Sequence, residues 1–185
     1  ACCFSEPAAR TADRIIAQIN PKMPTLGGKK ISLDKIDYIV PAESGLYTIG
    51  RAEIDARTQT IADYVAELVE DGATIQLGIG ALPDAIARNL MDKKDLGVHS
   101  ETLTEAMMEL VQAGVINNSK KTLNPGICIG AQAAGSEKFY EFIDHHPLFA
   151  VYPVDYVNNP YVVGQNYKQT SINSCMEVDP KGQVN

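Results

Sequence analysis

The sequence predicts an α/β fold of open, mostly parallel sheets with flanking helices. Along the chain, short apolar segments alternate with longer amphipathic ones, a pattern typical of strands joined by crossover helices. Hydrophobic residues make up 45% and charged residues 21% of the 185 residues, close to the averages of about 45–50% and about 25% for globular proteins. The composition therefore indicates a packed core and disfavours both disorder and a disulfide-held miniprotein.

The first part of the chain is predicted to contain a helix and two strands, followed by a linker. Ala and Arg favour the helix, the first strand is a short apolar run that ends at a proline, and the second alternates polar and apolar residues. Residues 41–50 carry Pro, Ser and Gly without periodicity, so we place a domain boundary near residue 50. The expected elements are a helix at 7–13, a buried strand at 14–20, a loop at 21–30 and a strand at 36–40.

A strand–helix–strand unit is predicted in the middle of the chain. It follows an amphipathic helix whose apolar residues recur at helical spacing from Ile54 to Leu68. The strand at 73–77 leads through a glycine turn into a helix with Pro83 in its first turn, and a second strand follows at 96–100. The remaining elements are helices at 83–91, 105–113 and 137–143, strands at 127–129, 148–154 and 170–173, and a hairpin pairing 177–178 with 183–184.

The charge and the hydropathy pattern argue against two classes of partner. Sixteen Lys and Arg against 23 Asp and Glu give a net charge of −7, whereas non-specific nucleic-acid binding depends on a positive field. No apolar run approaches the length of about 18 residues that a membrane span needs, and no signal peptide is visible at the N-terminus. We expect neither nucleic acid nor a membrane as a partner.

The cysteines and histidines do not form a metal-binding pattern. No two cysteines have the C-x-x-C spacing, and adjacent Cys2 and Cys3 cannot easily bridge to each other or share one tetrahedral site. The side chains of adjacent His145 and His146 diverge, and no third ligand is spaced nearby. We therefore expect no metal and a reducing, cytoplasmic location. The cysteines are Cys2, Cys3, Cys128 and Cys175.

The first candidate site is the glycine turn at 78–82, between a predicted strand and a predicted helix. Gly78 and Gly80 allow the backbone to bring its N–H groups close to an anion or a carbonyl oxygen. Pro83 stands where a dinucleotide-binding fingerprint needs its third glycine, which argues against a nicotinamide site. A tight turn without a ligand remains an alternative, since a lone Gly-x-Gly is a weak signal.

The second candidate is Glu101, which follows the next predicted strand. Because a right-handed crossover makes the two strands parallel, Glu101 and the glycine turn are expected at the same carboxyl edge of the sheet. A carboxylate facing backbone N–H donors is the arrangement that covalent catalysis with an oxyanion hole requires. The alternative is a solvated glutamate that caps the helix at Glu105. His99 is expected on the same strand face as Glu101, either as a supporting residue or as a packed one.

Other charged residues are expected to be structural. The pairs Lys93–Lys94 and Lys120–Lys121 are typical of solvated charges at helix ends, and binding of either pair to the phosphates of a ligand is the alternative. Glu177 is expected to serve the hairpin rather than to act as a second nucleophile.

Several extended segments, in order along the chain, resemble the acetyl-CoA hydrolase/transferase family, and within it the 4-hydroxybutyrate CoA-transferases. They are residues 69–85, 93–101, 153–160, 171–174, 177–179 and 182–184. The resemblance implies a two-domain CoA-transferase fold of which this chain is an interior fragment. Residues 1–50 would be the end of the N-terminal domain plus the linker, and residues 51–185 the first part of the C-terminal domain. Such a fragment would be inactive alone.

The resemblance also implies roles for individual residues. Glu101 would be the catalytic nucleophile, and the turn would contact CoA and supply an oxyanion-hole amide from Ile79. Asn158 would be an asparagine of the active site. Gln76 and His99, which are expected beside the turn and Glu101, are further candidates for active-site support, although the resemblance does not assign them. The residues of the turn are Gly78, Ile79, Gly80, Ala81 and Leu82.

The implied activity is transfer of CoA between a short-chain acyl-CoA and a carboxylic acid of the acetate, butyrate or 4-hydroxybutyrate type. The reaction would follow a ping-pong scheme through a glutamyl-CoA thioester. CoA would be a substrate, with no permanently bound cofactor, and the complete protein would be a homo-oligomer. An acyl-CoA hydrolase and a non-catalytic module that binds CoA or nucleotides remain the alternatives.

Overall fold

A six-stranded parallel sheet forms the centre of the protein. The computed structural model describes residues 3–51 and 53–185, so Cys2 lies outside the described residues. The strand order is β2-β7-β6-β5-β4-β8, and every pairing is parallel. The predicted α/β class with mostly parallel strands is therefore confirmed. The strands are β2 (Gly27–Gly28), β4 (Thr74–Leu77), β5 (Gly97–Thr104), β6 (Cys128–Ala134), β7 (Phe149–Val151) and β8 (Gln169–Ile172).

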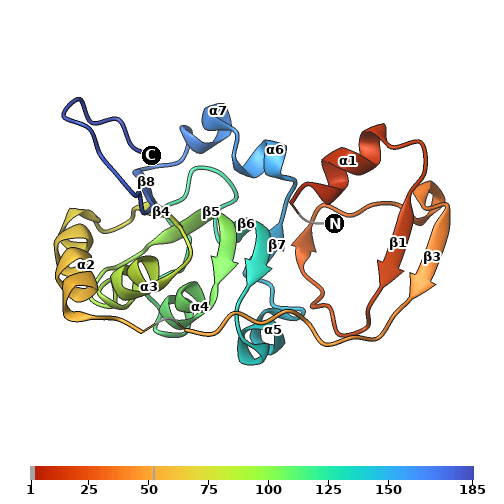
Figure 1. The fold of residues 1–185 in the computed structure, drawn as a ribbon, viewed down its shortest axis with the longest axis horizontal. Helices are drawn as coiled ribbons and strands as arrows, with labels where there is room; N and C mark the ends of the chain where they lie inside the picture. The colour runs from red at the N-terminus through yellow and green to blue at the C-terminus, as the bar shows by residue number, and fades with distance from the viewer. Residues whose placement is uncertain (1–2, 52) are drawn as a thin grey trace.

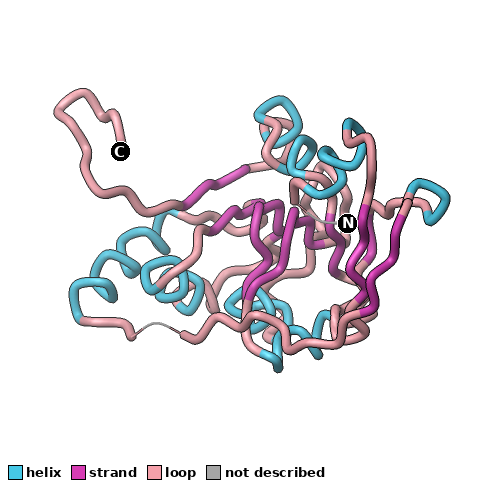
Figure 2. The backbone as a smooth tube through the Cα atoms, turned by 45° about the vertical axis from the view of Figure 1, so that its right-hand side comes forward, coloured by secondary structure: helices cyan, strands magenta, loops and turns pink. Residues whose placement is uncertain are grey.

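Helices cover both faces of this sheet (Figures 1 and 2). The alternation of strand residues separates two apolar clusters, since Cys128 and Phe149 pack with α2 to α5 whereas Ile129 and Ala150 pack against α6. The larger cluster is the main core. The helices are α2 (Ala56–Leu68), α3 (Ala81–Arg88), α4 (Glu105–Gln112) and α5 (Glu137–Ile143) on one face, and α6 (Val154–Val157) and α7 (Pro160–Val163) on the other.

The N-terminal part forms a separate two-stranded parallel sheet, at the right of Figure 1. The strands of this sheet are β1 (Ile16–Ile19) and β3 (Tyr38–Pro41). The same part of the chain contains α1 (Ser5–Thr11) and a short 3-10 helix (Leu33–Lys35). The expectation of a buried first strand is wrong for this chain, because both isoleucines at the ends of β1 are exposed, Ile16 at 67%. No second layer covers this small sheet within the part of the chain that the structure describes.

Strand β2 was not expected, because its sequence is two glycines inside a predicted loop. Gly27 and Gly28 pair with Ala150 and Val151 at the edge of the main sheet. Gly28 has φ +103°, and a Cβ atom there would lie 2.0 Å from the carbonyl oxygen of Val151. The approach of two backbones therefore requires glycine, which the composition of a loop does not distinguish from flexibility.

One further element differs from the prediction. The apolar run expected as one strand over 148–154 is a three-residue strand that ends at Val151 and then turns into α6. The predicted C-terminal hairpin is confirmed, since Val178 and Val184 form an antiparallel bridge with backbone hydrogen bonds on both sides of it. Of the helices in the described ranges, none is both long and apolar enough to cross a membrane.

Candidate active site

Glu101 lies within β5, level with the glycine turn. The register pairs Thr74 with Gly97 and Ile75 with Val98, and continuing it in step places Gly78 beside Glu101. The hydroxyl of Ser100 donates a hydrogen bond to the carbonyl of Leu77 at 3.3 Å, which is consistent with this register. The expectation that the strand ends before Glu101 is wrong, since β5 continues to pair with β6 after β4 has turned away.

The capping alternative for Glu101 does not fit the structure. Helix α4 begins at Glu105 with Thr104 at its N-cap, and Glu101 lies three residues further upstream, in the strand. The half-buried Glu101 carboxylate instead accepts a hydrogen bond at Oε2 from Nδ2 of Asn158, at 2.7 Å. Two residues that the sequence analysis placed in one site, 57 positions apart in the chain, are thus in direct contact.

His99 lies on the same face of β5 as Glu101, as expected. Its ring is 1% exposed, and Nε2 is 2.9 Å from the carbonyl oxygen of Val157, so Nε2 carries the proton and donates it. Burial lowers the pKa of His99, since desolvation disfavours the charged ring. Nδ1 has no hydrogen-bonding partner among the described residues. The neutral ring is therefore held by one hydrogen bond, to Val157. The next residue, Asn158, is the one that contacts Glu101.

The glycine turn connects β4 to α3 and presents free backbone amides. Gly80 is the N-cap of α3 with φ +114°, a conformation that favours glycine. Within the described residues, neither Ile79 nor Gly80 donates a backbone hydrogen bond, and both residues are exposed. Because the N-terminus of a helix favours negative charge, two free amides here can bind an anion or a developing oxyanion.

Gln76, in β4, restrains the start of the glycine turn through its side-chain amide. Its amide exchanges two hydrogen bonds with the amide of Asn173, at 3.0 and 2.9 Å. A Cβ atom at Gly78 would lie 3.3 Å from Oδ1 of Asn173, so the amide pair lies directly against the turn. Ala81 and Leu82, the remaining turn residues, begin α3 and are half-buried.

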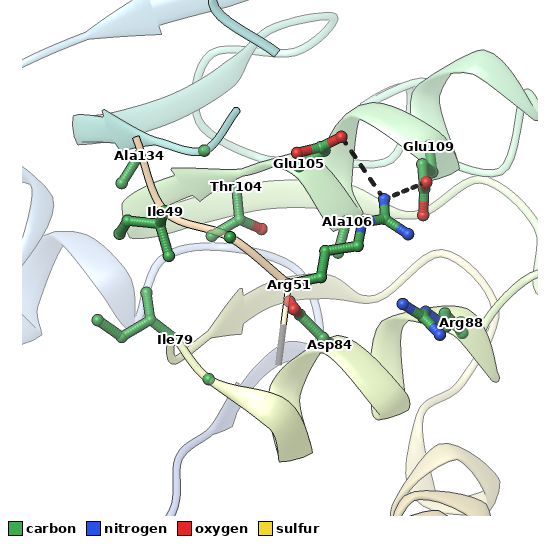
Figure 3. A pocket seen from close by; sticks show the side chains of 13 residues that line it. Ile49, Arg51, Ile79, Asp84, Arg88, Thr104, Glu105, Ala106, Glu109 and Ala134 are labelled. Carbon is green, nitrogen blue, oxygen red and sulfur yellow. Dashed lines mark hydrogen bonds and ion pairs between the residues drawn. The ribbon is translucent and has the colours of Figure 1, made fainter. Parts of the chain in front are cut away.

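A small cavity of about 60 Å³ lies beside the turn, towards α4 and the linker (Figure 3). Arg51 reaches across it to Glu109, with Glu105 at 3.7 Å, so the linker is attached to α4. Burial raises the pKa of Asp84 in its wall. Its lining includes Ile79 and Gly80 of the turn but not Glu101.

Lys121 is the main correction among the charged residues. It was expected to be a solvated charge, but it is only 5% exposed, and Nζ donates to the carbonyls of Val98 and Ile127 at 2.7 and 2.6 Å. Burial lowers its pKa to about 8. The side chain lies over Gly97, where a Cβ atom would be 2.4 Å from Cγ of Lys121. Neighbouring Lys120 is exposed as expected.

Sequence reasoning missed two partners of the site. These are Asn173 and the carbonyl of Val157. Both lie in segments that resemble the family, 171–174 and 153–160, but nothing in either segment indicates which contacts the two residues make. The order of the strands, which brings β8 beside β4, is the signal that points to Asn173. Within residues 3–51 and 53–185, no group of three or more His, Cys, Asp or Glu side chains is placed to hold a metal ion.

Comparison with known proteins places this chain in a family. Its parallel α/β fold matches that of solved CoA-transferases. A 4-hydroxybutyrate CoA-transferase from Porphyromonas gingivalis superposes with a TM-score of 0.93 at 38% identity, covering 100% of this chain and 47% of that one. RipA from Yersinia pestis has a TM-score of 0.93 at 35% identity, over 98% of this chain and 42–43% of that protein in two of its structures.

Sequence relatives agree with the structural ones. Residues 135–185 match the model of the acetyl-CoA hydrolase/transferase C-terminal domain. The 4-hydroxybutyrate coenzyme A transferase of Clostridium kluyveri is 47% identical over 182 residues, which are 98% of this chain and 42% of that protein. The chain belongs to the acetyl-CoA hydrolase/transferase family, and it spans about two fifths of the length of the curated relatives it matches.

Proposed function

We propose that this chain carries the nucleophile and part of the oxyanion hole of a CoA-transferase acting on short-chain acyl-CoA and carboxylate substrates. One observation carries the proposal. The Glu101 carboxylate, bonded to Asn158 at 2.7 Å, lies level with a glycine turn that has two free amides. The names of its relatives, which include 4-hydroxybutyrate and butyrate:acetate CoA-transferases, support this class of substrate.

In the proposed first half-reaction, a carboxylate oxygen of Glu101 attacks the thioester carbonyl carbon. The amides of Ile79 and Gly80 stabilise the tetrahedral oxyanion, and its collapse breaks the C–S bond and releases the CoA thiolate. The thiolate then attacks the glutamyl carbonyl of the anhydride, so the acyl group leaves as its carboxylate and a glutamyl-CoA thioester remains. Because a carboxylate is already ionised near neutral pH, this chemistry needs no general base.

In the second half-reaction, another carboxylate attacks the glutamyl-CoA thioester and the same steps run in reverse. CoA leaves and returns to the new acyl carbonyl, which regenerates the Glu101 carboxylate. CoA and the acids are substrates, and the scheme uses no permanently bound cofactor. Its kinetic consequence is a ping-pong pattern, with the first acid released before the second binds.

We further propose the division of the chain expected from its sequence. Residues 1–50 end an N-terminal CoA-transferase domain with its linker, and residues 51–185 begin the C-terminal one. Since the chain spans about two fifths of its relatives, the remaining walls of the cleft lie outside it, and we expect it to be inactive alone. We use "full-length enzyme" for a polypeptide that carries this sequence at the length of those relatives.

The covalent intermediate provides the test. The full-length enzyme is incubated with butyryl-CoA, reduced with borohydride and digested, and the modified peptide is mapped by mass. We expect Glu101 reduced to its alcohol in the wild type and in a Glu177→Gln control, and no modification in Glu101→Gln. An unmodified Glu101 in a turning-over enzyme would overturn the proposal.

The acceptor separates transfer from the alternatives. With acetate added, we expect acetyl-CoA to form faster than free CoA is released. Release of free CoA at a rate independent of acetate would indicate a hydrolase instead. Binding of CoA without turnover, unchanged in Glu101→Gln, would indicate a non-catalytic module.

A further inference from the structure

Every residue of the short helix α6 contacts a part of the chain that is distant in the sequence. Its amide and side-chain contacts come from the N-terminal segment, the loop before β6 and strand β5, so the helix is attached on both of its sides. A four-residue helix has almost no stability of its own, and its position is therefore set by these contacts. They join Val154 to Cys3, Asp155 to Arg10, Tyr156 to Asn124 and Val157 to His99.

Strand β5 contacts this segment through two alternate residues. His99 and Glu101 point to the same face of the sheet, because side chains in a strand alternate. His99 donates to the carbonyl of Val157, and the very next residue, Asn158, donates to Glu101. The two hydrogen bonds thus join adjacent side chains on one face of β5 to two consecutive residues, Val157 and Asn158.

The bond from His99 is the buried one of the two. The ring is 1% exposed and Val157 is 2% exposed, whereas Asn158 is exposed to solvent. A buried hydrogen bond that loses its donor leaves an unsatisfied carbonyl, at a cost of about 1–3 kcal/mol. His99 is therefore the contact that fixes the backbone at the residue next to Asn158, and the other contacts of α6 act further from it.

We propose that His99 is a positioning residue for the Glu101 nucleophile, acting through the Val157 carbonyl on the Asn158 amide. The inference deepens the proposed function and rests on it. Among the described residues, Asn158 is the hydrogen-bonding partner of the Glu101 carboxylate, and it occupies Oε2. This bond restrains the position of Oε2 and leaves Oε1 free for attack. An error of about 1 Å in such a geometry can cost about 100-fold in rate.

Two amide variants of equal polarity test this proposal in the full-length enzyme. In His99→Gln, Nε2 of the new side chain can take the place of the imidazole Nε2 and donate to Val157. In His99→Asn, the amide corresponds to Nδ1 and is too short to do so. We expect kcat to fall about 10- to 100-fold in His99→Asn and less than about threefold in His99→Gln, with the KM for acyl-CoA nearly unchanged in both.

A double variant tests whether His99 affects kcat through Asn158. The loss in the double variant His99→Asn/Asn158→Ala should equal the loss in Asn158→Ala alone, because removal of the asparagine amide already removes what His99 positions. Ser100→Ala, which removes a buried hydrogen bond from the opposite face of the same strand, is the control and should keep kcat. Hydrogen exchange of the β5 amides confirms that each variant is folded.

Three results would overturn the role of His99. These are equal kcat in His99→Asn and the wild type, equal losses in His99→Asn and His99→Gln, and multiplicative losses in the double variant. Borohydride mapping of Glu101 in the wild type is read separately. If Glu101 is modified while one of these results is obtained, only the positioning role fails, whereas an unmodified Glu101 rejects the proposed nucleophile itself.

Discussion

Gln76 and Asn173 form a closed pair of amide hydrogen bonds, at 3.0 and 2.9 Å, that connects β4 to the end of β8 beside the glycine turn. The two residues are 97 positions apart in the sequence. The glycine turn is therefore restrained by a distant segment of the chain. This restraint leads to the first prediction.

Replacing Gln76 with Leu should loosen the turn without unfolding the sheet. The substitution keeps the bulk of the side chain and removes both hydrogen bonds, so we expect a loss of about 1 kcal/mol in the free energy of unfolding, as for typical hydrogen bonds. Hydrogen exchange at the Ile79 amide should become faster. The same loss should follow from Asn173→Leu, and the double variant should be no less stable than either single one. Additive losses in urea unfolding would show that the two amides act independently.

Replacing Gly80 with Ala should impair the turn through its backbone. Gly80 has φ +114° and open space around its Cβ position, so the strain is conformational and costs about 1–3 kcal/mol. Because relief of the strain displaces the Ile79 and Gly80 amides, we expect kcat of the full-length enzyme to fall by about 100-fold, comparable to loss of one oxyanion-hole donor. Gly114→Ala, also at positive φ and in open space, should lower stability and keep kcat. Equal kcat in both variants would contradict the assignment of the turn.

The buried Lys121 should make stability rise with pH in a defined window. Its pKa in the folded state is about 8, below the ordinary 10.5, so the unfolded chain binds more protons between these values and stability increases as pH rises. The slope from this group is at most about 1.4 kcal/mol per pH unit. We expect unfolding free energies from pH 7.5 to 9 to rise more steeply in the wild type than in Lys121→Met. Cys128, whose pKa burial raises from the ordinary 9.0 to about 11, acts in the opposite direction near pH 9, but it is present in both proteins, so the difference between their slopes reports Lys121.

Lys120→Met is the matched control for this pH dependence. Lys120 is the exposed neighbour of Lys121, and its replacement should leave the slope at the wild-type value. A Lys121→Met variant with the wild-type slope would show that the buried ammonium does not titrate in this window.

Removing the charge of Arg10 should increase the mobility of α6. Arg10 pairs with Asp155 at 2.9 Å and also with Glu6, which connects α1 to α6. In Arg10→Met, we expect faster hydrogen exchange of the amides between Val154 and Asn158, because a contact on the outer side of the helix is lost. Arg14→Met is the exposed control and should leave these amides unchanged. Unaltered exchange in Arg10→Met would mean that α6 is held by its inner contacts alone.

The strand–helix–strand unit was predictable because local signals coincide there. An apolar run, a glycine turn, a proline in the first helical turn and a second apolar run each indicate the same structure, and β4, α3 and β5 follow in that order. The placement of Glu101 and the glycine turn at one edge of the sheet followed from the parallel strands of such a crossover, whereas the register that sets Glu101 level with Gly78 did not. The length of β5 beyond Ser100 was not predictable from its own residues, because pairing with β6 determines it.

The elements that were missed depend on tertiary contacts. Helices α6 and α7 have four residues each and no periodicity, and their contacts with distant segments determine them. Lys121 was placed in solvent because lysine is mostly exposed, whereas here Gly97 leaves room for its stem and two carbonyls accept its protons. The contact between Asn158 and Glu101 followed only from the resemblance to the family, since nothing local to either residue indicates the other.

The glycine strand β2 has a consequence for cutting the chain. Gly27 and Gly28 satisfy one side of β7, and the amide of Lys29 also donates to Val151 there. A shortened polypeptide that starts after the linker would leave this side of β7 unpaired. Exposed edge strands recruit other chains, so we expect residues 51–185 alone to self-associate through this edge, and the N-terminal segment supplied in trans to suppress that association.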